Sequence, residues 1–207
     1  MIKPIAYFFS TIITLTIVSC GNSDKLAIYG RKEYDPDTKD SVEHTIGSFY
    51  FINQNEDAIT QEYLKGNITV AYFFFTTCPS ICPIMTDNMK YLQEKTDKYD
   101  IQILAHTVDP ETDTTEKLKA YIERKNIDTK NWDFLTGDQD HLYDVGVNDY
   151  MVATQEDVNA LGGFLHSENF VLVDKDLRIR GFYDGTKKEE VDKLIKDIPK
   201  LINEYKN

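Results

Sequence analysis

Apolar residues occur along the chain either in short continuous runs or at helical spacing. Continuous runs bounded by polar residues are typical of strands buried on both faces. The runs and one hairpin pattern predict strands at Ser48–Asn53, Ile68–Phe75, Ile101–Val108, Trp132–Leu135, Phe170–Asp174 and Arg178–Tyr183. Helical spacing and start signals predict helices at 61–64, 83–98, 113–125, 138–145 and 187–205. We expect Asp113 and Glu116 to form a capping box at the start of one of them.

The order of these elements predicts an α/β fold. Strands and helices alternate in the first half, which indicates parallel strands with helical crossovers. A hairpin around Lys175–Asp176 and a last helix close the chain, so the central sheet is mixed and flanked by helices. A cysteine pair between the first long strand and its helix is the arrangement of thioredoxin-like folds. We expect a loop near 35–42 and one compact domain at 41–207.

The first 20 residues differ from the rest. Lys3 precedes an apolar run of 14 residues, Ile5–Val18, which is too short for a membrane helix but suits a signal peptide. The segment Ile17–Cys20 resembles a bacterial lipobox, in which cleavage precedes the Cys and its sulfur receives lipid. We interpret 1–19 as a lipoprotein signal peptide and 20–40 as the lipidated Cys20 with a polar tether. The alternative is an ordinary signal peptide with a chance cysteine.

Composition and charge narrow the function. A hydrophobic fraction of 41%, with 13 Tyr and 11 Phe, is enough for a real core and argues against disorder. The formal net charge of −12 repels phosphate backbones, so we expect no nucleic-acid partner. The anchor predicts an exported protein that is attached to a bacterial membrane and faces the periplasm or the cell exterior.

With Cys20 lipidated, Cys78 and Cys82 are each other's natural partners outside the cytoplasm. They lie one helical turn apart where a helix begins, and unpaired N–H groups there favour the thiolate. A thiolate binds metals or attacks disulfides. A purely structural disulfide is the weaker reading, because so short a loop contributes only roughly 2 kcal/mol. Structural zinc requires four closed ligands, and no second cysteine pair exists.

Copper(I) is soft and prefers thiolate, with imidazole acceptable, so two cysteines and one histidine would make a three-coordinate site. His44 and His141 are expected at the surface, and His106 lies inside an apolar strand. His166 precedes a strand in a Gly-rich loop, and its position alone does not decide whether it is a ligand. No proline occurs between Pro110 and Pro199, where thiol oxidoreductases of the thioredoxin class place a cis-proline. The absence of this proline weakens the hypothesis that the protein is an ordinary thiol oxidoreductase.

These motifs resemble the Sco/SenC family. Segment 74–83 is similar to its Cys-Pro-x-x-Cys-Pro signature, and segments 107–114, 137–139 and 165–167 follow in the expected order. The resemblance covers about 41–205. It implies a thioredoxin-like fold anchored to a membrane and facing away from the cytoplasm. It also implies a copper site made of Cys78, Cys82 and His166, and a role at the dinuclear copper centre of cytochrome c oxidase.

The sequence departs from the family at one position. The family commonly carries Asp just before the ligand histidine, and here that position is Leu165. The change removes a carboxylate that could stabilise Cu(II), whereas Cu(I) needs no hard oxygen ligand. We therefore expect copper as Cu(I), with Cu(II) as the second oxidation state considered. Asp109 is the other acidic residue that the resemblance places near the site; its alternative role is a turn residue before Pro110.

Three functions compete. The first is a copper metallochaperone, a binding protein rather than an enzyme, serving the copper-bearing subunit of cytochrome c oxidase or another copper or thiol protein. The second is a thiol–disulfide reductase in which Cys78 attacks and Cys82 resolves, forming a reversible disulfide bond. The third, a thiol peroxidase, lacks sequence support beyond the fold and the thiols.

Overall fold

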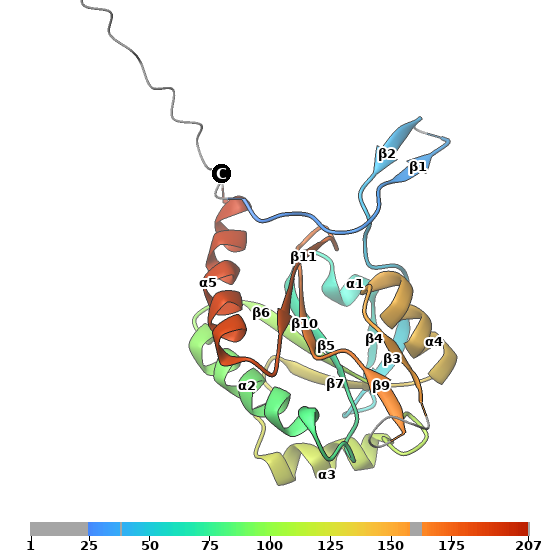
Figure 1. Ribbon diagram of the computed structural model, residues 1–207, viewed down its shortest axis with the longest axis vertical. Helices are drawn as coiled ribbons and strands as arrows, with labels where there is room; N and C mark the ends of the chain where they lie inside the picture. The colour runs from blue at the N-terminus through green and yellow to red at the C-terminus, as the bar shows by residue number, and fades with distance from the viewer. Residues whose placement is uncertain (1–24, 38, 158–162, 207) are drawn as a thin grey trace, which may run out of the picture.

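The computed structural model describes residues 25–37, 39–157 and 163–206. The predicted signal peptide and Cys20 lie outside the described residues. Within these, one seven-stranded sheet has the order β11-β10-β5-β6-β7-β3-β4 (Figure 1). Its strands are β3 (Tyr50–Asn53), β4 (Ala58–Thr60), β5 (Ile68–Phe74), β6 (Ile101–Thr107), β7 (Trp132–Thr136), β10 (Asn169–Val173) and β11 (Ile179–Asp184). The helices are α1 (Gln61–Leu64), α2 (Ile81–Thr96), α3 (Thr115–Lys125), α4 (Gln139–Asp144), the π-helical turn η1 (Val145–Asp149) and α5 (Lys188–Glu204).

The sheet is mixed, as predicted. Strands β5, β6 and β7 are parallel, whereas β10 and β3 pair antiparallel with β5 and β7. Every residue of β5 is buried, because helices cover both faces of the sheet. The predicted thioredoxin-like α/β class is confirmed by this topology together with the solved structures compared below.

Aromatic side chains fill the core on both faces of β5. Phe74 packs against Tyr121 of α3 on the face that also carries α2. Phe73 stacks on His106, and His106 in turn contacts Tyr150 beside η1 on the opposite face. Because successive strand residues point to opposite faces, the continuous run of phenylalanines supplies both halves of the core.

Two small hairpins were not predicted. β1 (Glu33–Asp35) pairs with β2 (Asp40–Val42), where we expected a loop, and this hairpin projects away from the main sheet (Figure 1). β8 (Thr154–Glu156) pairs with β9 (Phe164–His166) as a separate two-stranded sheet. Strands of three residues are too short to produce a readable hydrophobic period, and the same holds for β4.

The first described residues contact the domain, although we expected them in the tether. The Tyr29 backbone pairs with Ile179 in β11. The Arg180 guanidinium donates to the carbonyls of Leu26 and Ala27, at 2.7 and 3.0 Å. The boundary at residue 41 stays a prediction, but part of the segment before it is held to the sheet.

The start of α3 differs from the predicted capping box. Thr114 is the N-cap, and its side chain accepts a hydrogen bond from the Lys117 N–H. Asp113 instead turns into the interior and is fully buried. The prediction was wrong because Thr114 offers the same capping chemistry one residue later, while Asp113 finds buried donors elsewhere. Among the described residues, no helix combines the length and apolarity needed to cross a membrane.

Candidate metal centre

The cysteine pair lies where β5 gives way to α2. After Phe74 the chain forms a short loop, in which the Cys78 N–H donates to the Phe75 carbonyl at 3.3 Å. Cys82 is in the first turn of α2, followed directly by Pro83. Proline is favourable there because N–H groups of a first turn have no partner within the helix. Cys78 and Cys82 are both free cysteines in the structure.

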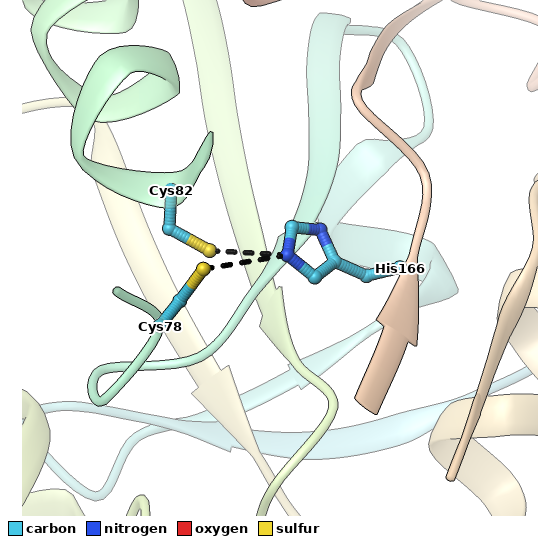
Figure 2. Close-up of side chains that lie close together, drawn as sticks. All are labelled: Cys78, Cys82 and His166. Carbon is cyan, nitrogen blue, oxygen red and sulfur yellow. Dashed lines mark hydrogen bonds between the residues drawn. The ribbon is translucent and has the colours of Figure 1, made fainter. Parts of the chain in front are cut away.

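His166 is the last residue of β9, and its ring points between the two sulfurs (Figure 2). Its Nε2 atom lies 3.2 Å from Cys82 Sγ and 3.9 Å from Cys78 Sγ. The three donor atoms all lie within 4.8 Å of one another. Their exposed fractions are 7% for Cys78, 1% for Cys82 and 7% for His166, so the site is nearly closed to solvent.

Two contacts fix the orientation of the His166 ring. Its Nδ1 atom lies 3.3 Å from the Ser167 carbonyl oxygen, which can only accept a hydrogen bond. The ring also packs edge-on against Phe75, with centroids 5.5 Å apart. A proton held on Nδ1 leaves the lone pair of Nε2 directed at the sulfurs, which is the tautomer a metal ligand requires.

The electrostatics of the pair are asymmetric. A hydrogen bond from Cys82 holds the pKa of Cys78 well below its usual range, against the opposing effect of burial. Backbone N–H groups at Ser80 and Cys82 lower the pKa of Cys78 further, as the helix N-terminus predicts. The same hydrogen bond, together with burial, raises the pKa of Cys82. The hydrogen bond between the two sulfurs therefore favours the thiolate at Cys78 and the protonated thiol at Cys82.

The donor set fits a soft cation. Two sulfurs and one imidazole nitrogen are the ligands that Cu(I) prefers, and no carboxylate belongs to the group. The three donors come from the loop after β5, the first turn of α2 and the end of β9, and all three residues are buried. Loading copper would replace the proton that the two thiols share, so metal binding releases protons.

The other three histidines lie apart from this group. His106 is fully buried in the aromatic core, as expected for a core residue. His44 and His141 were expected at the surface, but both are half-buried. The Nε2 atom of His44 lies 2.7 Å from the Asp149 carbonyl oxygen, and the His141 ring contacts Phe51.

The structure also shows where Asp109 and Leu165, the position at which the family commonly carries Asp, lie in the fold. Asp109 is buried, and its carboxylate accepts the Thr112 N–H at 3.2 Å, which is the contact of a turn residue. Leu165 lies in β9, paired in register with Gln155. Sequence reasoning missed the contacts of Asp113 with Thr76 and Thr107, residues that lie within the segments carrying the family resemblance.

Comparison with known proteins identifies the family. The SCO1/SenC family model matches residues 37–203. A SCO1/SenC family lipoprotein from Bacillus anthracis str. Ames is 31% identical, with a TM-score of 0.71, and the match covers 77% of this chain and 95% of that one. BsSco, a member of the Sco family of cytochrome c oxidase assembly proteins with an identified disulfide switch, is 31% identical. Its TM-score is 0.69, over 79% of this chain and 96% of that one.

A third solved structure contains the metal. ScoI of Bradyrhizobium japonicum with copper bound is 25% identical, with a TM-score of 0.62, over 73% of this chain and 98% of that one. The family match and the likeness of fold therefore agree over most of the described residues. The chain belongs to the SCO1/SenC family.

Proposed function

We propose that this protein is a membrane-anchored copper carrier of the extracytoplasmic space, which holds Cu(I) between Cys78, Cys82 and His166. The observation that carries the proposal is the convergence of two sulfurs and one imidazole nitrogen within 4.8 Å. The copper-bound relative and the membership of BsSco in a family of cytochrome c oxidase assembly proteins support it. The receiver we propose is the dinuclear copper centre of cytochrome c oxidase, or another copper or thiol protein.

The site suits a cargo that must leave again. Three ligands leave Cu(I) open to a fourth, so a thiolate of a receiving protein can join the metal before any donor of the carrier departs. Cys78 is the more exposed of the two cysteines, at 7% of the residue surface against 1% for Cys82. We infer that Cys78 or His166 leaves the metal first and that the buried Cys82 leaves last.

The proposed location rests on the sequence of the first 20 residues. The lipobox-like Ile17–Cys20 supports a lipid anchor, and the B. anthracis relative is a lipoprotein. An anchor followed by a polar segment keeps the carrier at the membrane where an oxidase resides.

One observation favours a second function, the reduction of the receiving centre's cysteines. The hydrogen bond between the two sulfurs lowers the pKa of Cys78 and raises the pKa of Cys82, which suits Cys78 as the attacking sulfur. Cys78 would attack a target disulfide and form a mixed disulfide. Cys82 would then displace the target thiolate, so that the target gains two electrons and this chain ends as a Cys78–Cys82 disulfide. A thiol reductant outside this chain must restore the dithiol.

The decisive experiment is an anaerobic Cu(I) titration of the reduced protein, residues 21–207, against a chromophoric Cu(I) chelator. We expect one equivalent to bind tightly, and binding to be lost in Cys78→Ser and Cys82→Ser. His166→Ala separates the two functions, because it should lose copper affinity while disulfide exchange with a model substrate continues. Undiminished copper affinity in His166→Ala would contradict the three-ligand site.

A further inference from the structure

Asp113 is a fully buried carboxylate that accepts three hydrogen bonds. Its Oδ2 atom accepts from the Thr76 N–H at 3.0 Å and from the Thr107 hydroxyl at 2.6 Å. Its Oδ1 atom accepts from the Thr76 hydroxyl. Since Thr76 follows β5 and Thr107 ends β6, one side chain joins the ends of two neighbouring parallel strands.

Thr76 is held through all of its polar groups. The N–H and the hydroxyl of Thr76 both donate to Asp113, and the carbonyl oxygen of Thr76 accepts a hydrogen bond from Arg124 Nη2 at 3.5 Å. Thr76 lies two residues before Cys78 on the same short loop. Thr76 is therefore bound by Asp113 just before the start of α3 and by Arg124 in the last turn of α3.

The other flank of the pair is attached to the same helix. Thr86 lies one turn after Cys82 in α2, and its hydroxyl is 2.8 Å from the Tyr121 hydroxyl of α3. Between the two anchors the Cys78 N–H donates to the Phe75 carbonyl at 3.3 Å, and the Ser80 hydroxyl lies 3.7 Å from Cys78 Sγ. Ser80, the N-cap of α2, makes no side-chain capping bond. On the side before Cys78 the loop is held through Thr76, whose N–H and hydroxyl both donate to Asp113.

We propose that Asp113 is a positioning residue for the metal site, which sets the loop so that the Cys78 sulfur reaches Cys82 and His166. The inference rests on the proposed function for its copper readout. The role is one of hydrogen-bond geometry rather than charge. An asparagine oxygen at the Oδ2 position would keep the bonds from the Thr76 N–H and Thr107, and its amide would donate to the Thr76 hydroxyl, which can reverse.

The test compares Asp113→Ala with Asp113→Asn in the anaerobic Cu(I) titration. Loss of groups that orient a metal ligand typically costs about 10–100-fold in affinity, so we expect at least a tenfold loss in Asp113→Ala. We expect Asp113→Asn to stay within about threefold of the unmodified protein, since all three bonds can be kept. Equal losses in both variants would overturn the geometric role, as would an unchanged affinity in Asp113→Ala.

A matched control separates positioning from general loss of stability. Asp174 is also fully buried and hydrogen-bonded, but it lies beyond Val173, which pairs with Thr69 near the start of β5, at the end of the strand away from the cysteines. We expect Asp174→Ala to destabilise the fold while leaving Cu(I) affinity unchanged. An affinity loss in Asp174→Ala equal to that in Asp113→Ala would reject the proposal.

A copper-free readout distinguishes failure of this inference from failure of the proposed function. Equilibration of the Cys78–Cys82 disulfide with glutathione reports how well the loop brings the sulfurs together. We expect Asp113→Ala to favour the dithiol by about tenfold or more, an effect of the size expected for lost ligand positioning, and Asp113→Asn to resemble the unmodified protein. If the unmodified protein bound no copper, the proposed function would fail, and this equilibrium would still decide the role of Asp113.

Should Asp113→Ala fail to fold, Thr76→Val replaces it. That variant removes one hydroxyl bond to Asp113 and keeps the backbone bond. We expect a smaller shift in the same direction for both readouts, and no shift in either would overturn the proposal.

Discussion

The Nε2 atom of His166 lies 3.2 Å from the Sγ atom of Cys82, although 84 residues separate the two in the chain. Cys82 belongs to the helix that follows the central strand, whereas His166 ends a small hairpin outside the main sheet. The site therefore exists only when the hairpin is docked, and its chemistry depends on tertiary structure as much as on the cysteine motif.

The histidines provide a matched series for copper binding. We expect His166→Asn to weaken Cu(I) binding at least about tenfold, because a nitrogen ligand is lost. His44→Asn and His141→Asn should leave the affinity unchanged, since neither ring belongs to the cysteine group. Competition titration against a Cu(I) chelator measures all three. A comparable loss in either control would place the third ligand elsewhere.

The asymmetry of the thiols predicts which cysteine reacts first. Because the pKa of Cys78 is lowered and that of Cys82 is raised, we expect iodoacetamide to modify Cys78 first in the reduced, copper-free protein. Reaction at Cys78 should persist at pH 6, where an ordinary thiol is almost fully protonated. Peptide mass spectrometry after short exposures assigns the modified residue. If both cysteines were modified equally, and modification of both declined below pH 8, Cys78 would not be the more reactive thiol.

Buried His106 predicts a specific loss of stability in acid. Burial lowers the pKa of His106 to about 3, from 6.5 in the unfolded chain, and neither ring nitrogen has a hydrogen-bond partner in the described residues. Between pH 3 and pH 6.5 His106 binds a proton in the unfolded state but not in the folded state. The contribution of neutral His106 to folding stability is therefore complete above pH 6.5 and is lost as pH falls toward 3. The slope approaches about 1.4 kcal/mol per pH unit.

The His106→Leu variant isolates this contribution from that of the carboxylates. Urea denaturation at several pH values gives the free energy of unfolding of both proteins. We expect the unmodified protein to lose stability relative to His106→Leu on moving from pH 6.5 to pH 4. Parallel pH profiles would show that His106 titrates normally in the folded state.

The contacts of the first described residues predict that the domain needs part of its expected tether. Arg180 is 3% exposed at its side chain and pairs with Asp174 and Glu204. Removing residues 21–40 would leave it without the carbonyls of Leu26 and Ala27. We expect that loss to cost about 1–3 kcal/mol, as for buried polar groups left unsatisfied. Urea denaturation of chains 21–207 and 41–207 measures the difference, and equal stabilities would support the boundary at 41.

Sequence patterns predicted every strand of the main sheet except β4, and also the cysteine pair, because these are local signals. The apolar run through Phe73 and Phe74 identifies a strand buried on both faces. The four-residue spacing of Cys78 and Cys82 indicates that the two cysteines lie close together. The place of His166 could not be derived in this way, because it depends on a hairpin with three-residue strands; only the family resemblance indicated it. Asp113 was misassigned because its neighbour Thr114 can cap the helix equally well.

The separation of β8 and β9 from the main sheet would give an ion bound at the proposed site a mechanical role. Cys78 and Cys82 lie where β5 gives way to α2, whereas His166 lies on a hairpin that forms a separate two-stranded sheet. An ion held between them is a cross-link, so the loaded protein would be stiffer at this edge than the empty one. A receiving protein that touches the hairpin could sense the presence of the cargo before it touches the metal.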